Sequence, residues 1–196
     1  MKDIIICSGN PKKINEFEKI SELNPNIKAN FIPITARFPD FDVEETAESF
    51  FENSLLKAQA GAKLTGGFCI ADDSGIEIEA LGGKPGIYSK RYLEAKANGI
   101  HDVLEELKDA SNRACRYVCS IVFVDPQGKL LFKTENYWQG EITFEAKGAN
   151  GFGYDPIVKP KEYPDKTVAE LDTEVKNSLS HRAQAMRELT NFLMQN

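Results

Sequence analysis

Apolar side chains recur along the first half of this chain with periods that alternate between strand and helix. Short clusters of Gly, Pro, Asn and Asp, which favour turns, separate them. The predicted elements are a strand at 3–8, a helix that carries Ile14, Phe17, Ile20 and Leu23, a strand at 27–34 and a helix from Thr46 to Gly66. The first half therefore predicts strands and helices in alternation.

A pair of acidic residues follows the next apolar run. Residues 68–71 predict a buried strand, and Asp72-Asp73-Ser74-Gly75 directly after it predicts a tight turn. Apolar and acidic residues then alternate over 76–80, which is typical of a half-exposed strand. We therefore expect two strands with an acidic turn between them.

Strands predominate in the second half. The predicted elements are a helix at 93–107 that Gly99 can split, strands at 116–124 and 130–138 joined by a turn, a strand at 141–145, a glycine-rich loop at 148–155 and a final helix from about Ser180. Early alternation followed by a run of strands predicts an α/β fold with a mixed sheet. The length of 196 residues, without repeats or linkers, predicts a single domain over 1–196.

The charge balance narrows the classes of partner. Lys and Arg total 24 against 30 Asp and Glu, which gives a net charge of -6. Proteins that bind nucleic acid through its phosphates usually carry the opposite balance, so we expect neither nucleic acid nor an anionic membrane as a partner. The apolar run at Ile4–Ile6 is too short for a signal peptide, and each of the four cysteines lies in a predicted strand. We therefore expect a cytoplasmic protein with reduced, buried cysteines.

The first predicted turn carries misplaced positive charge. Asn10 suits a helix N-cap and Pro11 a first helical residue, but Lys12 and Lys13 then lie at the positive end of the helix dipole. An anion bound between free backbone N–H groups and these lysines would remove the repulsion, so the turn predicts a phosphate site. A solvated basic turn is the alternative. Without a ligand, we expect Lys13 to destabilise the protein.

The start of the last helix repeats this feature. Ser180 suits an N-cap, and His181 and Arg182 follow in the first turn, with Lys176 just upstream. Alone, the pair would more often be a surface pair, or His181 a structural histidine. Together the two basic helix starts point to a ligand with several negative charges.

Such a ligand usually brings magnesium, which takes one or two carboxylates from the protein. Asp72-Asp73 offers adjacent carboxylates, and a second acidic group leads into the second helix. The second acidic group consists of Asp42, Glu44, Glu45, Glu48 and Glu52. For this group, an acid-rich helix start without a metal is the alternative.

The glycine-rich loop at 148–155 offers contacts to a base. Phe152 or Tyr154 could stack on the base, and Asp155 could accept a hydrogen bond from it.

Seven motifs in order resemble the inosine triphosphate pyrophosphatase family over nearly the whole chain. These motifs are Ser8-Gly9-Asn10-Pro11-Lys12-Lys13, Glu44-Glu45-Thr46, Glu52-Asn53-Ser54-Leu55-Leu56-Lys57-Ala58, Ala71-Asp72-Asp73-Ser74-Gly75, Pro85-Gly86-Ile87-Tyr88-Ser89-Lys90-Arg91-Tyr92, Gly151-Phe152-Gly153-Tyr154-Asp155-Pro156, and Lys176 with Ser180-His181-Arg182. The resemblance implies an elongated mixed sheet with helices that form two lobes around a substrate cleft. It also implies a magnesium-dependent homodimer that hydrolyses non-standard purine nucleoside triphosphates to the monophosphate and pyrophosphate.

The resemblance also assigns roles. Asp73 is the catalytic residue and, with Glu44, a magnesium ligand, while the nearby alternatives Glu45 and Asp72 stay open. The residues expected to bind substrate are Ser8, Gly9, Asn10, Pro11, Lys12, Lys13, Ser74, Phe152, Gly153, Tyr154, Asp155, Lys176, His181 and Arg182. Two rival hypotheses remain: a Maf-like nucleotide pyrophosphatase with a different base preference, and a non-catalytic nucleotide or nucleic-acid binding module, which the negative charge disfavours.

Overall fold

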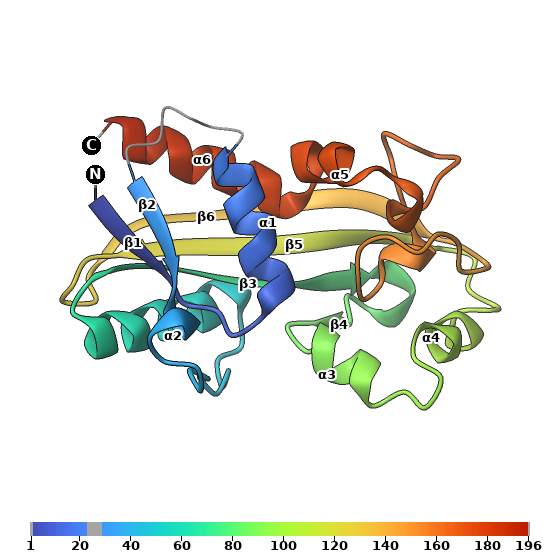
Figure 1. The fold of residues 1–196 in the computed structure, drawn as a ribbon. Coiled ribbons are helices and arrows are strands. Elements are labelled where there is room, and N and C mark those ends of the chain that lie inside the picture. Colours follow the sequence, from blue (N-terminus) through green and yellow to red (C-terminus); the bar gives the residue numbers. More distant parts are fainter. Residues whose placement is uncertain (1, 23–28, 196) are drawn as a thin grey trace. The chain divides into compact units, whose positions relative to one another are not determined.

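The computed structural model describes residues 2–22 and 29–195, and within them the chain packs into two compact units (Figure 1). Unit 1 comprises the described residues up to Asp73, Cys119–Asn136 and those from Arg182 onward; unit 2 comprises Ser74–Val118 and Tyr137–His181. The prediction of a single domain stays a prediction.

The elements fall into three groups. Unit 1 alone contains β1 (Lys2–Ile6), α1 (Pro11–Glu22), β2 (Ala29–Pro33), the 3-10 helix η1 (Ile34–Ala36) and α2 (Phe50–Thr65). Unit 2 alone contains η2 (Glu79–Leu81), β4 (Pro85–Gly86), α3 (Ser89–Glu94), α4 (Ile100–Glu106), η3 (Asp155–Ile157), β7 (Val158–Pro160), η4 (Val168–Glu170) and α5 (Thr173–Leu179). Residues of both units occur in β3 (Phe68–Ile78), β5 (Ala114–Val124), β6 (Leu130–Ile142) and α6 (His181–Gln195).

The strands form one mixed sheet in the order β2-β1-β3-β5-β6-β7, with β4 paired to β3. The pairs β1–β2 and β1–β3 are parallel, whereas β3–β4 and β6–β7 are antiparallel. The prediction of an α/β fold with a mixed sheet is confirmed. Within the described ranges, none of the helices combines the length and apolar character needed to cross a bilayer.

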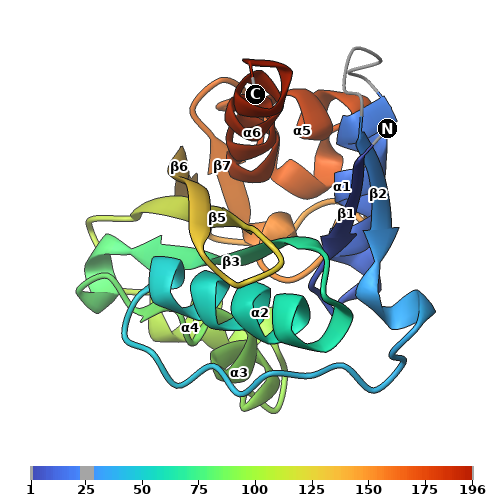
Figure 2. The same ribbon diagram turned by 90° about the vertical axis from the view of Figure 1, so that its left-hand side faces the viewer.

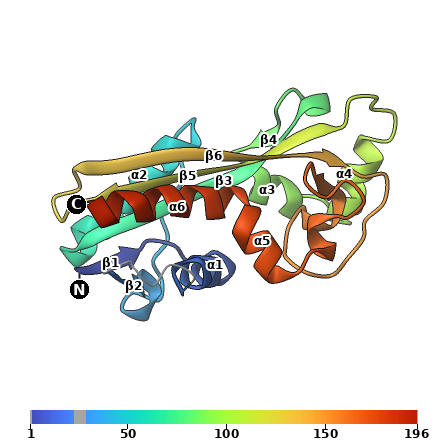
Figure 3. The ribbon, with the colours of Figure 1, turned by 90° about the horizontal axis from the view of Figure 1, so that it is seen from above.

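Unit 1 has an apolar core on each face of its strands. Successive strand side chains point to opposite faces, so Ile4 and Ile6 pack with Met186 of α6, whereas Ile5 packs with Ala58 of α2. Figure 2 shows α2 and α6 on opposite sides of β3 and β5, and Figure 3 shows α6 running alongside β5 and β6. All four cysteines are free and buried, as expected.

Unit 2 has its own core, built around the only tryptophan of the sequence. Trp138 on β6 is 2% exposed, its ring stacks on Tyr117 of β5, and its indole N–H donates to Glu162. Buried Ile76 and Ile78 belong to the same core, so the alternating pattern predicted over 76–80 is a strand face as far as Ile78, and residues 79–80 belong to η2.

The acidic turn predicted at 72–75 is wrong, because β3 runs unbroken through it. Neighbouring strands pair with both ends of β3: β1 with 68–70 and β4 with 76–77. Backbone pairing on either side of the acidic pair holds the segment extended. The strand predicted at 130–138 likewise continues without a break to Ile142 as β6, whereas residues 143–145 of the strand predicted at 141–145 are not in a strand.

Other differences are local. Gly99 separates α3 from α4, as its place in the predicted helix indicated. Helix α2 begins at Phe50, later than predicted, because Ser49 caps it by accepting from the Glu52 N–H. The apolar spacing indicated none of α5, β4, β7 and the 3-10 helices. Leu23 and residues 27–28, predicted to lie in a helix and a strand, are outside the described residues.

Candidate active site

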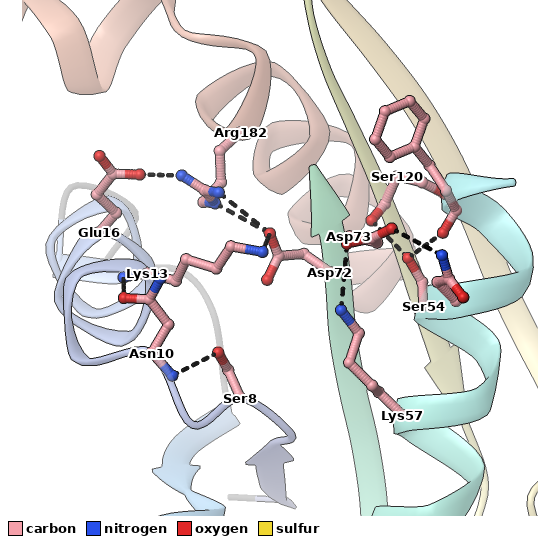
Figure 4. A network of polar contacts seen from close by, with 12 residues as sticks. Ser8, Asn10, Lys13, Glu16, Ser54, Lys57, Asp72, Asp73, Ser120 and Arg182 are labelled. Carbon is pink, nitrogen blue, oxygen red and sulfur yellow. Dashed lines mark hydrogen bonds and ion pairs between the residues drawn. The ribbon is translucent and has the colours of Figure 1, made fainter. Parts of the chain in front are cut away.

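Two adjacent carboxylates of β3 have separate partners on the two faces of the strand (Figure 4). Asp72 points toward α1 and α6, and Asp73 points toward α2. The period of two along a strand produces this separation. Each carboxylate therefore has its own electrostatic environment.

Asp72 is the centre of a buried charge cluster. Its Oδ2 lies 3.0 Å from Lys13 Nζ and accepts from Arg182 Nε at 3.3 Å and Nη2 at 3.1 Å. The guanidinium of Arg182 also donates through Nη1 to Glu16 of α1. Burial alone would raise the pKa of Asp72, but Lys13 and Arg182 outweigh it and hold that pKa well below its usual range. Asp72 therefore stays ionised and fixes both cations.

The negative charge of Asp73 is compensated less fully than that of Asp72. Lys57 Nζ lies 3.4 Å from its Oδ1 and 2.6 Å from Glu45 Oε1, while Asn53 Nδ2 donates to its Oδ2 at 3.3 Å. Burial raises the pKa of Asp73, and Glu45 and Asp72 raise it further, against the opposing effect of Lys57 and Lys13. A carboxylate with a raised pKa is a stronger base than an ordinary one.

The carboxylates of Glu45 and Asp73 together suit a metal ion. Lys57 Nζ already lies against the carboxylates of Glu45 and Asp73, so one cation is shared by two oxygen donors. Oxygen donors from one or two carboxylates are what magnesium usually takes from a protein. No group of three or more His, Cys, Asp or Glu side chains in the described part of the chain could hold a metal ion. An ion at Asp73 would thus complete its coordination with phosphate oxygens and water.

In the turn before α1, Asn10 is the predicted N-cap, but the backbone N–H groups of the first helical turn are not free. The side-chain oxygen of Asn10 accepts from the N–H of Lys12 at 3.0 Å and of Lys13 at 3.4 Å, and its carbonyl accepts from Ile14 at 3.1 Å. The first-turn donors are therefore already satisfied. The expectation that Lys13 destabilises the empty protein loses its premise, because Asp72 supplies the missing negative charge.

A second polar group lies in unit 2, around Asp155. Its Oδ1 accepts from the Tyr117 hydroxyl at 2.9 Å, and its Oδ2 accepts from the Phe152 N–H at 2.8 Å and from Lys176 Nζ at 2.9 Å. Lys176 Nζ also lies 4.7 Å from the centre of the Phe152 ring. The imidazole of His181 stacks on Tyr117, with ring centres 5.0 Å apart and planes 9° apart.

The structure thus gathers many of the predicted site residues into two groups. Lys13, Asp73 and Arg182 with its partners lie in unit 1, and Phe152, Asp155, Lys176 and His181 lie in unit 2. Arg182 and Lys176 each already contact a carboxylate, so the second basic helix start is internally compensated.

The other predicted residues have varied environments. Tyr154 is buried in the unit 2 core, and its hydroxyl donates to the Ser89 carbonyl at 2.9 Å. Gly153 has a φ of 62°, in the left-handed region that glycine tolerates best. Ser74 is half-buried, whereas Lys12 and Glu44 are exposed.

Sequence reasoning assigned no role to Glu16, Asn53, Lys57 or Tyr117. Asn53 and Lys57 are four residues apart on α2, and both are buried, which places them on the helix face toward Asp73. A lysine and an asparagine on the apolar side of a predicted helix were the available indication. Glu16 and Tyr117 gave none, because their partners are distant in sequence.

Known proteins resemble this chain over nearly its full length. A family model described as the Ham1 family matches residues 4–192. A dITP/XTP pyrophosphatase of Prochlorococcus marinus (strain NATL1A) is 40% identical over 192 residues, which cover 98% of this chain and 94% of that protein. One of Staphylococcus aureus (strain MW2) is 43% identical over 197 residues, covering 98% and 97%.

Solved structures agree. The Staphylococcus aureus Ham1 protein has a TM-score of 0.85 at 40% identity, covering 99% of both chains. A HAM1 protein from Coxiella burnetii has a TM-score of 0.88 at 37% identity, covering 100% of both. The resemblance that the seven motifs carried is thereby confirmed: this chain belongs to the Ham1 family.

Proposed function

We propose that this protein hydrolyses non-standard purine nucleoside triphosphates, namely ITP, dITP and XTP, to the nucleoside monophosphate and pyrophosphate. The names of its relatives, at about 40% identity over nearly full length, support this activity. The observation that carries the proposal is the buried pair Asp72 and Asp73, in which one carboxylate is fixed by two cations and the other keeps a raised pKa.

The chemistry assigned to unit 1 concerns the phosphates and water. Asp73 orients the attacking water toward the α-phosphorus and takes up its proton, for which a raised pKa suits it. Lys57 supplies positive charge beside Asp73, and the turn Ser8–Lys13 holds the triphosphate, with the exposed Lys12 as its most accessible cation. Attack at the α-phosphorus releases pyrophosphate.

Magnesium belongs to the proposal, with Asp73 and Glu44 as ligands and Glu45 as the neighbouring alternative. When bound, the ion neutralises charge on the phosphate oxygens. The carboxylates of the protein would hold the ion, and it would take its remaining ligands from phosphate oxygens and water.

The nucleoside is assigned to residues of unit 2: Ser74, Phe152, Gly153, Tyr154, Asp155, Lys176 and His181. Phe152 supplies an aromatic face, while Lys176 and His181 supply polar groups. Arg182, which contacts Asp72 and Glu16, is also assigned to the nucleoside, and only the resemblance to the family supports that assignment. Donors set against a 6-keto oxygen discriminate against adenine, because an amino group there leaves those donors unpaired.

A product analysis tests this function. The protein is incubated with ITP, dITP, XTP, GTP and ATP, with magnesium or with a chelator, and pyrophosphate and orthophosphate are measured separately. We expect pyrophosphate from the first three substrates with magnesium. Orthophosphate and nucleoside diphosphate as first products would contradict the proposal, and turnover of other bases alone would favour the Maf-like alternative.

Asp73→Asn tests the assigned base. The amide keeps the size of the side chain but cannot take the proton, so we expect the rate to fall by roughly two to four orders of magnitude. Circular dichroism and thermal unfolding check that the variant folds. Near-normal turnover in a folded variant would exclude Asp73 as the base.

We also propose a homodimer, which analytical ultracentrifugation tests, and a cytoplasmic location, which the four free cysteines support.

A further inference from the structure

Tyr117 lies at the unit 2 end of β5 and contacts the groups assigned to the nucleoside without belonging to any of the seven motifs. It is 7% exposed, and its ring stacks on two other rings. The His181 imidazole lies nearly parallel to it, with ring centres 5.0 Å apart, and Trp138 stacks at 6.2 Å. The ring therefore sets the plane in which the imidazole lies.

Within the part of the chain that the structure describes, the Tyr117 hydroxyl has one hydrogen-bond partner, the carboxylate of Asp155, to which it donates at 2.9 Å. Burial raises the pKa of Tyr117 well above its ordinary value, and Asp155 raises it further, so the phenol keeps its proton and remains the donor. The bond is thus charge-assisted, of the stronger class.

The carboxylate of Asp155 links Tyr117 to two further groups. Three donors converge on the buried carboxylate: the Tyr117 hydroxyl, the Phe152 N–H and Lys176 Nζ. Tyr117 holds one oxygen, while Phe152 and Lys176 share the other. Loss of the Tyr117 donor leaves Oδ1 buried and unpaired, which favours rotation of the carboxylate away from the geometry that holds Lys176.

We propose that Tyr117 is the positioning residue for the nucleoside-binding groups of unit 2. Its hydroxyl fixes Asp155, and through it Lys176 and Phe152, and its ring fixes His181. The inference rests on the proposed function, in which these four residues surround the nucleoside. Tyr117 itself does not touch the substrate in this arrangement; it acts on affinity and base preference, not on cleavage.

Tyr117→Phe separates the hydroxyl from the ring. The variant keeps the stack on His181 and loses only the bond to Asp155. We expect KM for ITP to rise at least about tenfold, the loss typical of one hydrogen bond to a charged group. We expect kcat to stay within about twofold, because the groups assigned to the water and the phosphates lie in unit 1 and keep their contacts.

Tyr92→Phe is the matched control. Tyr92 lies in the same unit, and its hydroxyl also donates to a carboxylate, Glu106, at 2.5 Å. The Tyr92 hydroxyl donates to Glu106 and to none of Asp155, Lys176, Phe152 and His181 among the described residues, although its ring packs against the core that contains Tyr154. Since Tyr92→Phe keeps that ring, KM should rise much less than in Tyr117→Phe. Tyr117→Leu, which also removes the ring, should raise KM further than Tyr117→Phe does.

Calorimetric binding of inosine monophosphate to the same variants separates this inference from the proposed function. If wild-type protein binds the nucleotide but hydrolyses no triphosphate, the proposed function fails, and weaker binding by Tyr117→Phe still supports the positioning role. Wild-type KM and binding in a folded Tyr117→Phe would overturn the inference. A lower kcat with unchanged KM would also overturn it, and so would an equal loss in Tyr92→Phe.

Discussion

Asp72 and Asp73 are the same residue type, adjacent on one strand, yet their environments push their pKa values in opposite directions. Asp72 has Lys13 and Arg182 against one oxygen, whereas Asp73 has only Lys57 at 3.4 Å and an amide. Pairs of acids with separated pKa values are typical of acid–base sites. Asp72 therefore serves stability, and Asp73 is available for chemistry.

Asp72→Asn should remove a pH-dependent part of the stability. The folded-state pKa of Asp72 lies below its unfolded value, so its contribution is present above about pH 4, the ordinary aspartate range, and is lost as the pH falls further. We expect the variant to be less stable than wild type at neutral pH, by roughly 3 to 5 kcal/mol, because Arg182 and Lys13 lose their partner. Urea unfolding from neutral to acidic pH measures both effects.

The difference between the two proteins should shrink as the pH falls through the acid range, because wild type loses the contribution that the variant never had. A difference that stays constant with pH would contradict the assignment of this stability to the Asp72 carboxylate.

Lys13→Glu should destabilise the empty protein, because it sets a second negative charge beside buried Asp72. The expected loss is roughly 3 to 5 kcal/mol, the range for breaking a buried ion pair. Lys12→Glu is the control: Lys12 is exposed at the same helix start, so its replacement should change stability by less than about 1 kcal/mol. Denaturant unfolding without ligand compares them, and equal losses in both variants would contradict the role of Asp72.

Helix α2 packs against β1 and β3 in the unit 1 core, and Gly61 lies where a side chain has no room. A Cβ at this position would overlap Cys7 Sγ and lie 3.3 Å from Cys69 Sγ, both in the unit 1 core. The absence of a side chain therefore sets how near α2 lies to the strands, and with it the placement of Asn53 and Lys57 beside Asp73.

Gly61→Ala should destabilise the protein by roughly 1 to 3 kcal/mol, because overpacking outweighs the better helix propensity of alanine. Gly67→Ala is the control, since its Cβ would meet its nearest atoms at an ordinary 3.5 Å. Adding Cys7→Ala should rescue Gly61→Ala, and thermal unfolding of the double variant measures the coupling. A double variant as unstable as the sum of the single ones would contradict a clash with Cys7.

The elements that sequence periodicity predicted well are those whose pattern is local. Helices α1, α2 and α6 and strands β1 and β5 follow from apolar spacing, and the Asn10 cap follows from the residues beside it. The predicted turn at 72–75 failed because two acids in a buried strand are stable only with cations from other elements. One of these, Arg182, lies 110 positions away from Asp72, and no local pattern indicates such a partner.

Both units have a core of their own, yet three strands and one helix contribute residues to both. Unfolding of either unit would therefore break hydrogen bonds in strands that the other also uses. Shared strands favour one cooperative transition for the whole chain.

Ile121→Ala tests this cooperativity. Ile121 is fully buried in unit 1, so its truncation should cost roughly 2 to 5 kcal/mol. Trp138, the only tryptophan, lies in the core of unit 2 and reports on that unit through its fluorescence. We expect the fluorescence midpoint in denaturant to fall together with the midpoint from circular dichroism. A fluorescence midpoint unchanged by the substitution would show that the units unfold independently.

Because β3 runs unbroken through the acidic pair, the position of each acid along the strand decides which face it lies on. Whether a carboxylate faces Lys13 and Arg182 or faces Lys57 depends only on whether its position along the strand is odd or even. Inserting one residue before Asp72 would turn each acid to the opposite face of the strand. Asp72 would then face Lys57, and Asp73 would lie on the face of Lys13 and Arg182. Insertion of two residues would restore the facing directions. It would also move both acids about 6.6 Å along the strand, away from the cations that now contact them. Over this stretch, the length of the chain is therefore as tightly constrained as the identity of its acids.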